Sequence, residues 1–79
     1  MKELKVKQDF LSLEKGDLLC SQLENGDFYW SGIFLKREKD VLYYFILNTG
    51  NKKHFRFVSS GISTFIGEVS AGIKHFKAN

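Results

Sequence analysis

The stretch that decides the fold runs from Leu18 to Val58 and reads LLCSQLENGDFYWSGIFLKREKDVLYYFILNTGNKKHFRFV. It divides into four strand-like segments, at 17–23, 28–35, 41–47 and 53–58, which three polar turns separate. The first turn contains Asn-Gly, the strongest short-range hairpin signal, because both central residues of a type I′ turn need positive φ. The stretch therefore predicts an antiparallel meander.

The residues before this stretch predict one more strand. Residues 3–10 place Leu4, Val6 and Phe10 on one face and charged side chains on the other. Such alternation is typical of a strand with one wet face, which brings the expected number of strands to five. The segment 41–47 is apolar on both faces, so we expect other elements to cover both of them.

The C-terminal residues predict an amphipathic helix over 61–76. At 100° per residue, one stripe collects the six apolar residues Ile62, Phe65, Ile66, Val69, Ile73 and Phe76. Gly67 and Gly72 oppose a helix by about 1 kcal/mol each, but both lie off the stripe. We expect the helix to cover the second apolar face of 41–47, and the late residue His75 to act as a cation near the helix C-terminus.

Size and composition indicate one small domain over residues 1–79, with a β part at 1–58 and the helix at 61–76. The chain has 79 residues, twelve of them aromatic, and a net charge of +3. A lone cysteine, Cys20, excludes an internal disulfide and predicts a reducing compartment, with the thiol buried and inert. No segment resembles a signal peptide or spans about 20 apolar residues. These features predict a soluble, cytoplasmic protein without a membrane partner.

Three short motifs resemble those of Src-homology-3 (SH3) domains. Residues 11–19, LSLEKGDLL, resemble the hydrophobic-Ser-hydrophobic run that meets Lys-Gly-Asp in that family. Asp27-Phe28-Tyr29-Trp30 resembles the opening of the family's third strand, and Phe57-Val58-Ser59-Ser60 resembles the turn before its last strand. The resemblance implies a mainly β fold, a five-stranded antiparallel SH3-like small barrel or meander, here followed by the C-terminal helix.

The departures from that family concern its ligand groove. No room exists before Leu11 for the long acidic loop of SH3 domains, and the groove's proline and tyrosine are absent after Val58. The resemblance therefore implies the barrel without proline-peptide binding. Bacterial and phage SH3-like barrels with short loops, which bind proteins or nucleic acids, are the closer comparison.

Signals for enzymatic chemistry are weak. His54 together with Ser59, Ser60 and a carboxylate lacks a nucleophile elbow. Cys20, the histidines and the carboxylates show no metal-ligand spacing, and the glycines do not form a phosphate-binding loop. We therefore expect no enzyme, no cofactor and no metal.

The leading hypothesis is a non-enzymatic protein-interaction module. The strands carry more large aromatic groups than one small core can absorb, and exposed rings on a small domain mark contact sites. The predicted contacts are Tyr29, Trp30, Tyr44 and Arg56. An accessory subunit or a small phage- or mobile-element-encoded inhibitor, occluding a partner's surface, fits this size and the Lys/Asn/Ile/Phe-rich usage.

Two alternatives remain open. The first is nucleic-acid binding through cations interleaved with aromatic rings, namely Lys36, Arg37, Lys52, Lys53 and Arg56. These cations are equally explained as solvated hairpins over an aromatic core. The second alternative is a symmetric homodimer through the aromatic surface.

Overall fold

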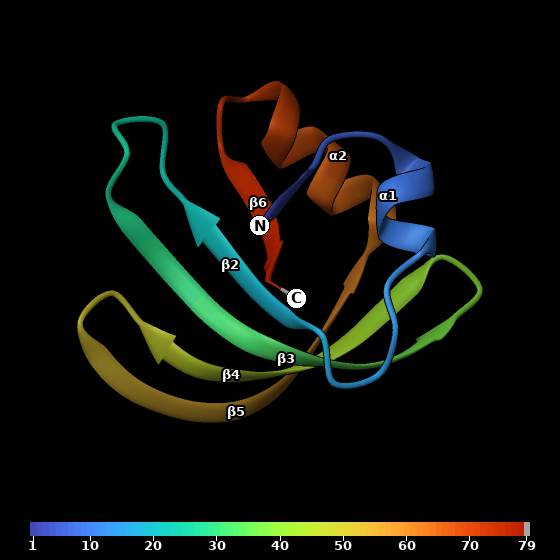
Figure 1. The fold of residues 1–79 in the computed structure, drawn as a ribbon, viewed down its shortest axis with the longest axis horizontal. Helices are drawn as coiled ribbons and strands as arrows, with labels where there is room; N and C mark the ends of the chain where they lie inside the picture. Colours follow the sequence, from blue (N-terminus) through green and yellow to red (C-terminus); the bar gives the residue numbers. More distant parts are fainter. Residues whose placement is uncertain (79) are drawn as a thin grey trace.

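The computed structural model describes residues 1–78 as one antiparallel sheet with two helices against one of its faces (Figure 1). The elements in chain order are β1 (Lys2–Leu4), α1 (Lys7–Leu11), β2 (Leu18–Gln22), β3 (Phe28–Glu38), β4 (Val41–Thr49), β5 (Lys52–Gly61), α2 (Ile62–Ser70) and β6 (Lys74–Ala78). The six strands lie in the order β1-β6-β2-β3-β4-β5. Neither helix has the length and apolarity that crossing a membrane requires.

The central meander is confirmed. β2 pairs with β3, β3 with β4, and β4 with β5, all antiparallel. Gly26 and Gly50 adopt positive φ in the first and third turns, and Lys39 does so in the second, at 55°. The strands are longer than predicted, and β5 continues to Gly61, beyond the β part that was expected to end at residue 58.

The predicted five-stranded barrel is wrong, because the sheet has six strands and stays open. The C-terminal strand β6 lies between β1 and β2, pairing Phe76 with Glu3 on one side and with Cys20 on the other. This insertion separates the first two strands of the chain. β1 and β5 are left as the two edges of the sheet.

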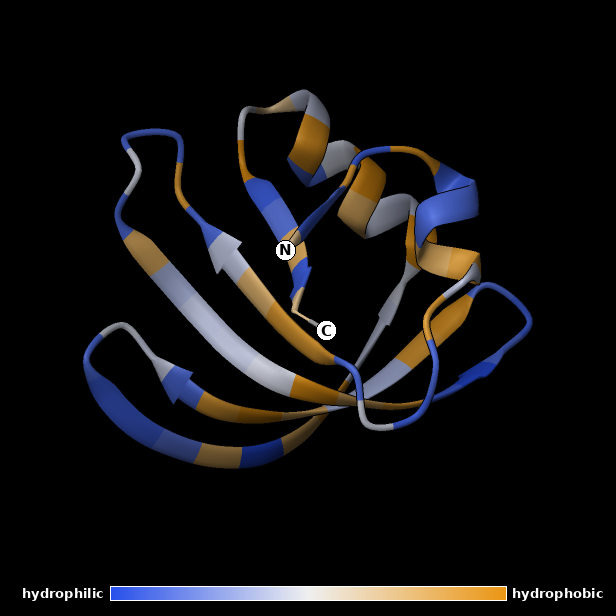
Figure 2. Cartoon of the chain, viewed as in Figure 1, coloured by the Kyte–Doolittle hydropathy of each residue, from blue (hydrophilic) through white to orange (hydrophobic). Residues whose placement is uncertain are grey.

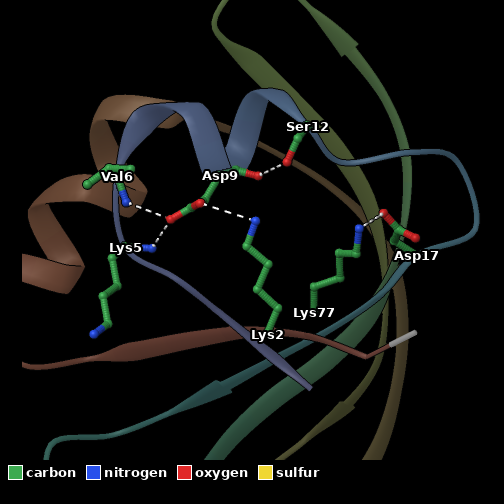
Figure 3. Close-up of polar contacts among 7 residues, drawn as sticks. All are labelled: Lys2, Lys5, Val6, Asp9, Ser12, Asp17 and Lys77. Carbon is green, nitrogen blue, oxygen red and sulfur yellow. Dashed lines mark hydrogen bonds and ion pairs between the residues drawn. The ribbon is translucent and has the colours of Figure 1, made fainter.

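The predicted strand over 3–10 is also wrong, because Asp9 starts a helix there. The Asp9 carboxylate accepts hydrogen bonds from the backbone N–H groups of Lys5 and Val6, at 2.8 and 3.1 Å (Figure 3). The two bonds fix the turn between β1 and α1, as a first-turn acidic residue does in a capping box. α1 then buries Phe10 against Phe65 of α2 at 5.2 Å between ring centroids, while Val6 is exposed.

The helix predicted over 61–76 is shorter, because Gly72 ends it. α2 ends at Ser70, and Gly72 follows with φ of 97°. Ile73 N–H donates to Glu68 O at 3.0 Å and Gly72 N–H donates to Val69 O at 3.1 Å. This pair of bonds is a Schellman motif, which turns the chain out of the helix. The residues after it form β6.

The core lies between the concave face of the sheet and the two helices. Figure 1 shows β3, β4 and β5 curving around the side that α1 and α2 occupy. On β4, Leu42, Tyr44 and Ile46 face inward and are buried, and α2 contributes Phe65 beside Tyr44. The expectation that both faces of this strand are covered is wrong. No element within residues 1–78 covers the opposite, convex face (Figure 1).

Substitution by alanine should change the free energy of unfolding in opposite directions at Gly67, within α2, and at Gly72, just after its C-terminus. Gly72→Ala should lower the free energy of unfolding by about 1–2 kcal/mol, because an L-residue at positive φ is strained, and the new Cβ lies 3.1 Å from Glu24 Cγ. Gly67→Ala should raise it by about 0.5–1 kcal/mol, because nothing lies within 4 Å of its Cβ position. Urea unfolding of both variants measures the sign of each change in the free energy of unfolding. Changes of the same sign in the two variants would refute the Schellman motif.

Candidate functional site at the open edge of the sheet

The strand β5 is the long open edge of the sheet. It pairs with β4 on one side, and no strand among residues 1–78 pairs with its other side. All six residues from 52 to 57 are exposed, although two of them are phenylalanines. The start of β5 is hydrophilic, and hydrophobic and hydrophilic positions alternate after it (Figure 2). An edge of this length and composition is accessible from both faces of the sheet.

On the convex face, β5 carries an outer aromatic cluster made of Phe45, Phe55 and Phe57. Phe57 lies opposite Phe45 in the β4–β5 register, with ring centroids 4.9 Å apart, and Phe55 stacks on Phe45 at 6.1 Å. Phe55 is 62% exposed and Phe57 is 78% exposed. An adjacent groove of about 360 Å³ lies between Leu35, Tyr43 and Phe57. These side chains leave apolar surface in water that a partner could bury.

On the concave face, the four predicted contact residues line one inner groove of about 190 Å³. These residues are Tyr29, Trp30, Tyr44 and Arg56. Trp30 and Tyr44 stack at 5.1 Å and are only 8% and 5% exposed, so they form walls. Burial raises the pKa of Tyr44, whose hydroxyl lies 2.9 Å from Ser60 Oγ. Tyr29 and Arg56 are exposed at this groove and reachable by a partner.

The five predicted nucleic-acid contacts fall into two separate groups. Lys36 and Arg37 lie near the β3–β4 turn, whereas Lys52 and Lys53 lie opposite Thr49 and Asn48 at the other end of β4. Arg56 is on the same strand as the two lysines and lies opposite Ile46, nearer the middle of β4. Lys36 forms an ion pair with Glu38 at 2.6 Å, and Arg37 donates to the backbone oxygen of Lys39. The structure therefore keeps only Lys52, Lys53 and Arg56 together, on β5.

A triad of Ser21, His75 and Glu68, of which the first two are buried and Glu68 is half-buried, was missed from the sequence. His75 Nδ1 contacts Ser21 Oγ, and His75 Nε2 lies 3.1 Å from Glu68 Oε1. The neutral Nε2–H tautomer satisfies both contacts, since Nδ1 then accepts the serine hydroxyl and Nε2–H donates to the carboxylate. The expectation of a helix-terminal cation is wrong, because His75 lies in β6 and burial lowers its pKa to about 4.

The triad holds three elements together and offers no access to a substrate. It links β2, α2 and β6, and the rings of Phe10, Trp30 and Phe65 surround His75. Ser21 has 0% exposure, so no acyl group can approach its Oγ in this structure. Residues 74–77 read Lys-His-Phe-Lys, and this short run carries no periodic signal that places the His75 ring inward.

The other residues considered for chemistry are dispersed. His54 Nδ1 lies 3.2 Å from Thr49 Oγ1, whereas Ser60 contacts Tyr44, so these residues form no triad. Cys20 is half-buried on β2, and burial raises the pKa of its thiol. Over residues 1–78, no three His, Cys, Asp or Glu side chains are placed to hold a metal ion.

The buried triad predicts that acid weakens the fold. Because the His75 pKa is about 4 in the folded chain and about 6.5 when unfolded, the unfolded chain binds more protons between these values. The free energy of unfolding should fall by up to about 3 kcal/mol as the pH drops from 7 to 4. The burial-raised pKa of Glu68 acts with the opposite sign and offsets part of this loss.

Urea unfolding between pH 8 and pH 4 measures this loss. His75→Gln should flatten the pH dependence above pH 5, because the variant has no imidazole to protonate in the core. His54→Gln is the matched control, since His54 is exposed. If the free energy of unfolding of His75→Gln depends on pH as steeply as that of the original chain, His75 is not the group that causes the acid sensitivity.

Among the residues of the inner groove, Trp30 is buried whereas Tyr29 and Arg56 are exposed, so their alanine variants should differ in stability. Trp30→Ala should cost about 3–5 kcal/mol of unfolding free energy, because it removes a core ring. Tyr29→Ala and Arg56→Ala should each stay within about 0.5 kcal/mol of the original chain, as exposed substitutions usually do. Thermal and urea unfolding of the three variants test this, and a stable Trp30→Ala would contradict the packing.

Comparisons with protein-family models, with curated proteins and with solved structures give no match to this chain. The similarity to SH3-like domains therefore stays a prediction from short motifs.

Proposed function

We propose that this chain is a non-enzymatic protein-interaction module that binds through β5 and the two surfaces beside it. The observation that carries the proposal is the exposure of Phe55 and Phe57, at 62% and 78%, on an edge strand. The two exposed phenylalanine rings leave apolar surface in contact with water. Burying that surface against a partner would be favourable in free energy. Exposed rings clustered beside polar groups are characteristic of contact sites.

Arg56 supports a polar component of the same site. It lies between Phe55 and Phe57 in sequence, opposite Ile46, and reaches the inner groove beside Tyr29. No carboxylate within residues 1–78 forms an ion pair with it. Arginine and aromatic residues are the types that most often dominate protein interfaces. The site thus combines apolar anchors with an available guanidinium group.

A module of this kind acts by occupying a partner's surface. This is the action of an accessory subunit or of a small inhibitor, and no cofactor is needed for it. The small SH3-like architectures that the sequence motifs resemble are used in this way on different partners. The proposed contact lies on one edge of the sheet, and the buried rings of Trp30 and Tyr44 form the walls of its inner groove.

Nucleic-acid binding is the second candidate, and the cations of β5 favour it. Arg56 lies between the exposed Phe55 and Phe57, and Lys52 and Lys53 precede them on the same strand. Rings beside cations can stack bases and hold phosphates. This candidate predicts an affinity that falls steeply with salt, because counterions are released. The ion pair at Lys36 and the separation of Arg37 from β5 leave a small basic surface for it.

Affinity capture from the native host's lysate, with and without nuclease, separates the two candidates. Phe57→Ser should abolish capture of the bound protein, because it removes the most exposed ring of the outer aromatic cluster. Val6→Ser is the matched control, since Val6 is 58% exposed on the N-terminal side of α1. Nuclease should leave the captured protein in place.

Two outcomes would contradict the proposal. If nuclease releases everything that is captured, nucleic acid is the partner. If Phe57→Ser and Val6→Ser capture the same proteins in the same amounts, β5 is not the contact surface.

A further inference from the structure

We infer that the partner adds an extended strand to the free edge of β5, and that this strand alternates acidic with apolar side chains. The inference rests on the proposed function and specifies the class of partner. It follows from three features of β5, namely its backbone, the two faces of its side chains and its charge.

The backbone of β5 has hydrogen-bonding groups without a neighbouring strand. In an antiparallel ladder, alternate residues direct their N–H and C=O groups toward opposite neighbours. β5 is ten residues long and has β4 on one side alone. The other edge strand, β1, has three residues and is too short to template a long added strand. β5 is therefore the edge within residues 1–78 that suits strand addition.

The side chains of β5 present different chemistry on the two faces. Arg56 faces the inner groove, whereas Phe55 and Phe57 face the outer aromatic cluster. Neighbouring strands place directly opposed residues on the same face of a sheet. An added strand would thus set a carboxylate beside Arg56 and apolar side chains beside the two phenylalanines. This requirement gives the alternating pattern.

Charge selects an acidic partner over a second copy of this chain. β5 carries Lys52, Lys53 and Arg56 and contains no Asp or Glu. None of these three cations has an ion-pair partner within the described part of the chain. Lysines on an edge strand disfavour pairing with an identical edge, because like charges meet. The same lysines attract a strand that carries carboxylates.

A synthetic peptide tests the inference on the full chain. The probe is a capped nonapeptide that alternates glutamate with valine, titrated into labelled protein at low salt. Binding should slow amide exchange at alternate residues of β5, because their outward N–H groups gain acceptors. Arg56→Glu and Phe57→Ser should each weaken the affinity about fivefold, whereas Lys5→Glu, a charge reversal beside α1, should leave it unchanged (Figure 3). Circular dichroism of each variant checks that it is folded.

The control probes define the results that would overturn the inference. A peptide with the same residues in two blocks, an alternating lysine–valine peptide and an oligodeoxythymidine should all bind more weakly. Tighter binding of the oligonucleotide, equal binding of the block peptide, or perturbation at β1 in place of β5 would each refute strand addition. If lysate capture depends on Phe57 while the peptide protects no β5 amide, the proposed function stands and the edge-pairing inference fails.

Discussion

The buried contact of His75 with Ser21 and Glu68 is the interaction on which the architecture depends. It joins the last strand to β2 on one side and to α2 above it, within a shell of three aromatic residues. An imidazole in such a place must be neutral and must satisfy both ring nitrogens, because unpaired buried polar groups are costly. The serine and the carboxylate supply these partners. β6 is thereby held in the interior of the sheet, between β1 and β2.

This arrangement makes the two ends of the sheet different. At one end, β6, β1 and the helices enclose the core, and Asp9 and Lys77 secure the connections through contacts with Lys2 and Asp17 (Figure 3). At the other end, β5 has one neighbour and two exposed rings. Both proposed binding surfaces adjoin that strand. The enclosed strand β6 and the open edge β5 thus lie on opposite sides of the central meander, and Glu68, which contacts His75, also lines the inner groove.

The sequence predicted the elements whose signals are local. Asn25-Gly26 and the turns at 36–40 and 48–51 located the meander, and the apolar stripe beginning at Ile62 located α2. It did not predict where α2 ends, because Gly72 was counted as a cost to a helix when it is the residue that terminates one. The prediction of a five-stranded barrel was wrong for the same reason. The residues after Gly72 form a strand, and its neighbours β1 and β2 are distant in sequence.

The sequence predicted only part of the candidate site, because it does not show which side chains the fold buries. Tyr29, Trp30, Tyr44 and Arg56 do meet at one groove, but the stacking of Trp30 on Tyr44 turns two of them into core residues. Phe55 and Phe57 were not among the predicted contacts, because alternation identifies two faces of a strand and does not show which face is covered.

Amide hydrogen exchange of the unliganded chain distinguishes the enclosed strand from the open edge. The amides of β6 should exchange among the slowest in the protein, because this strand has a neighbour on both sides and a buried histidine. In β5, alternate amides should exchange quickly, because their outward N–H groups have no acceptor. Uniformly slow exchange along β5, or fast exchange in β6, would contradict the account.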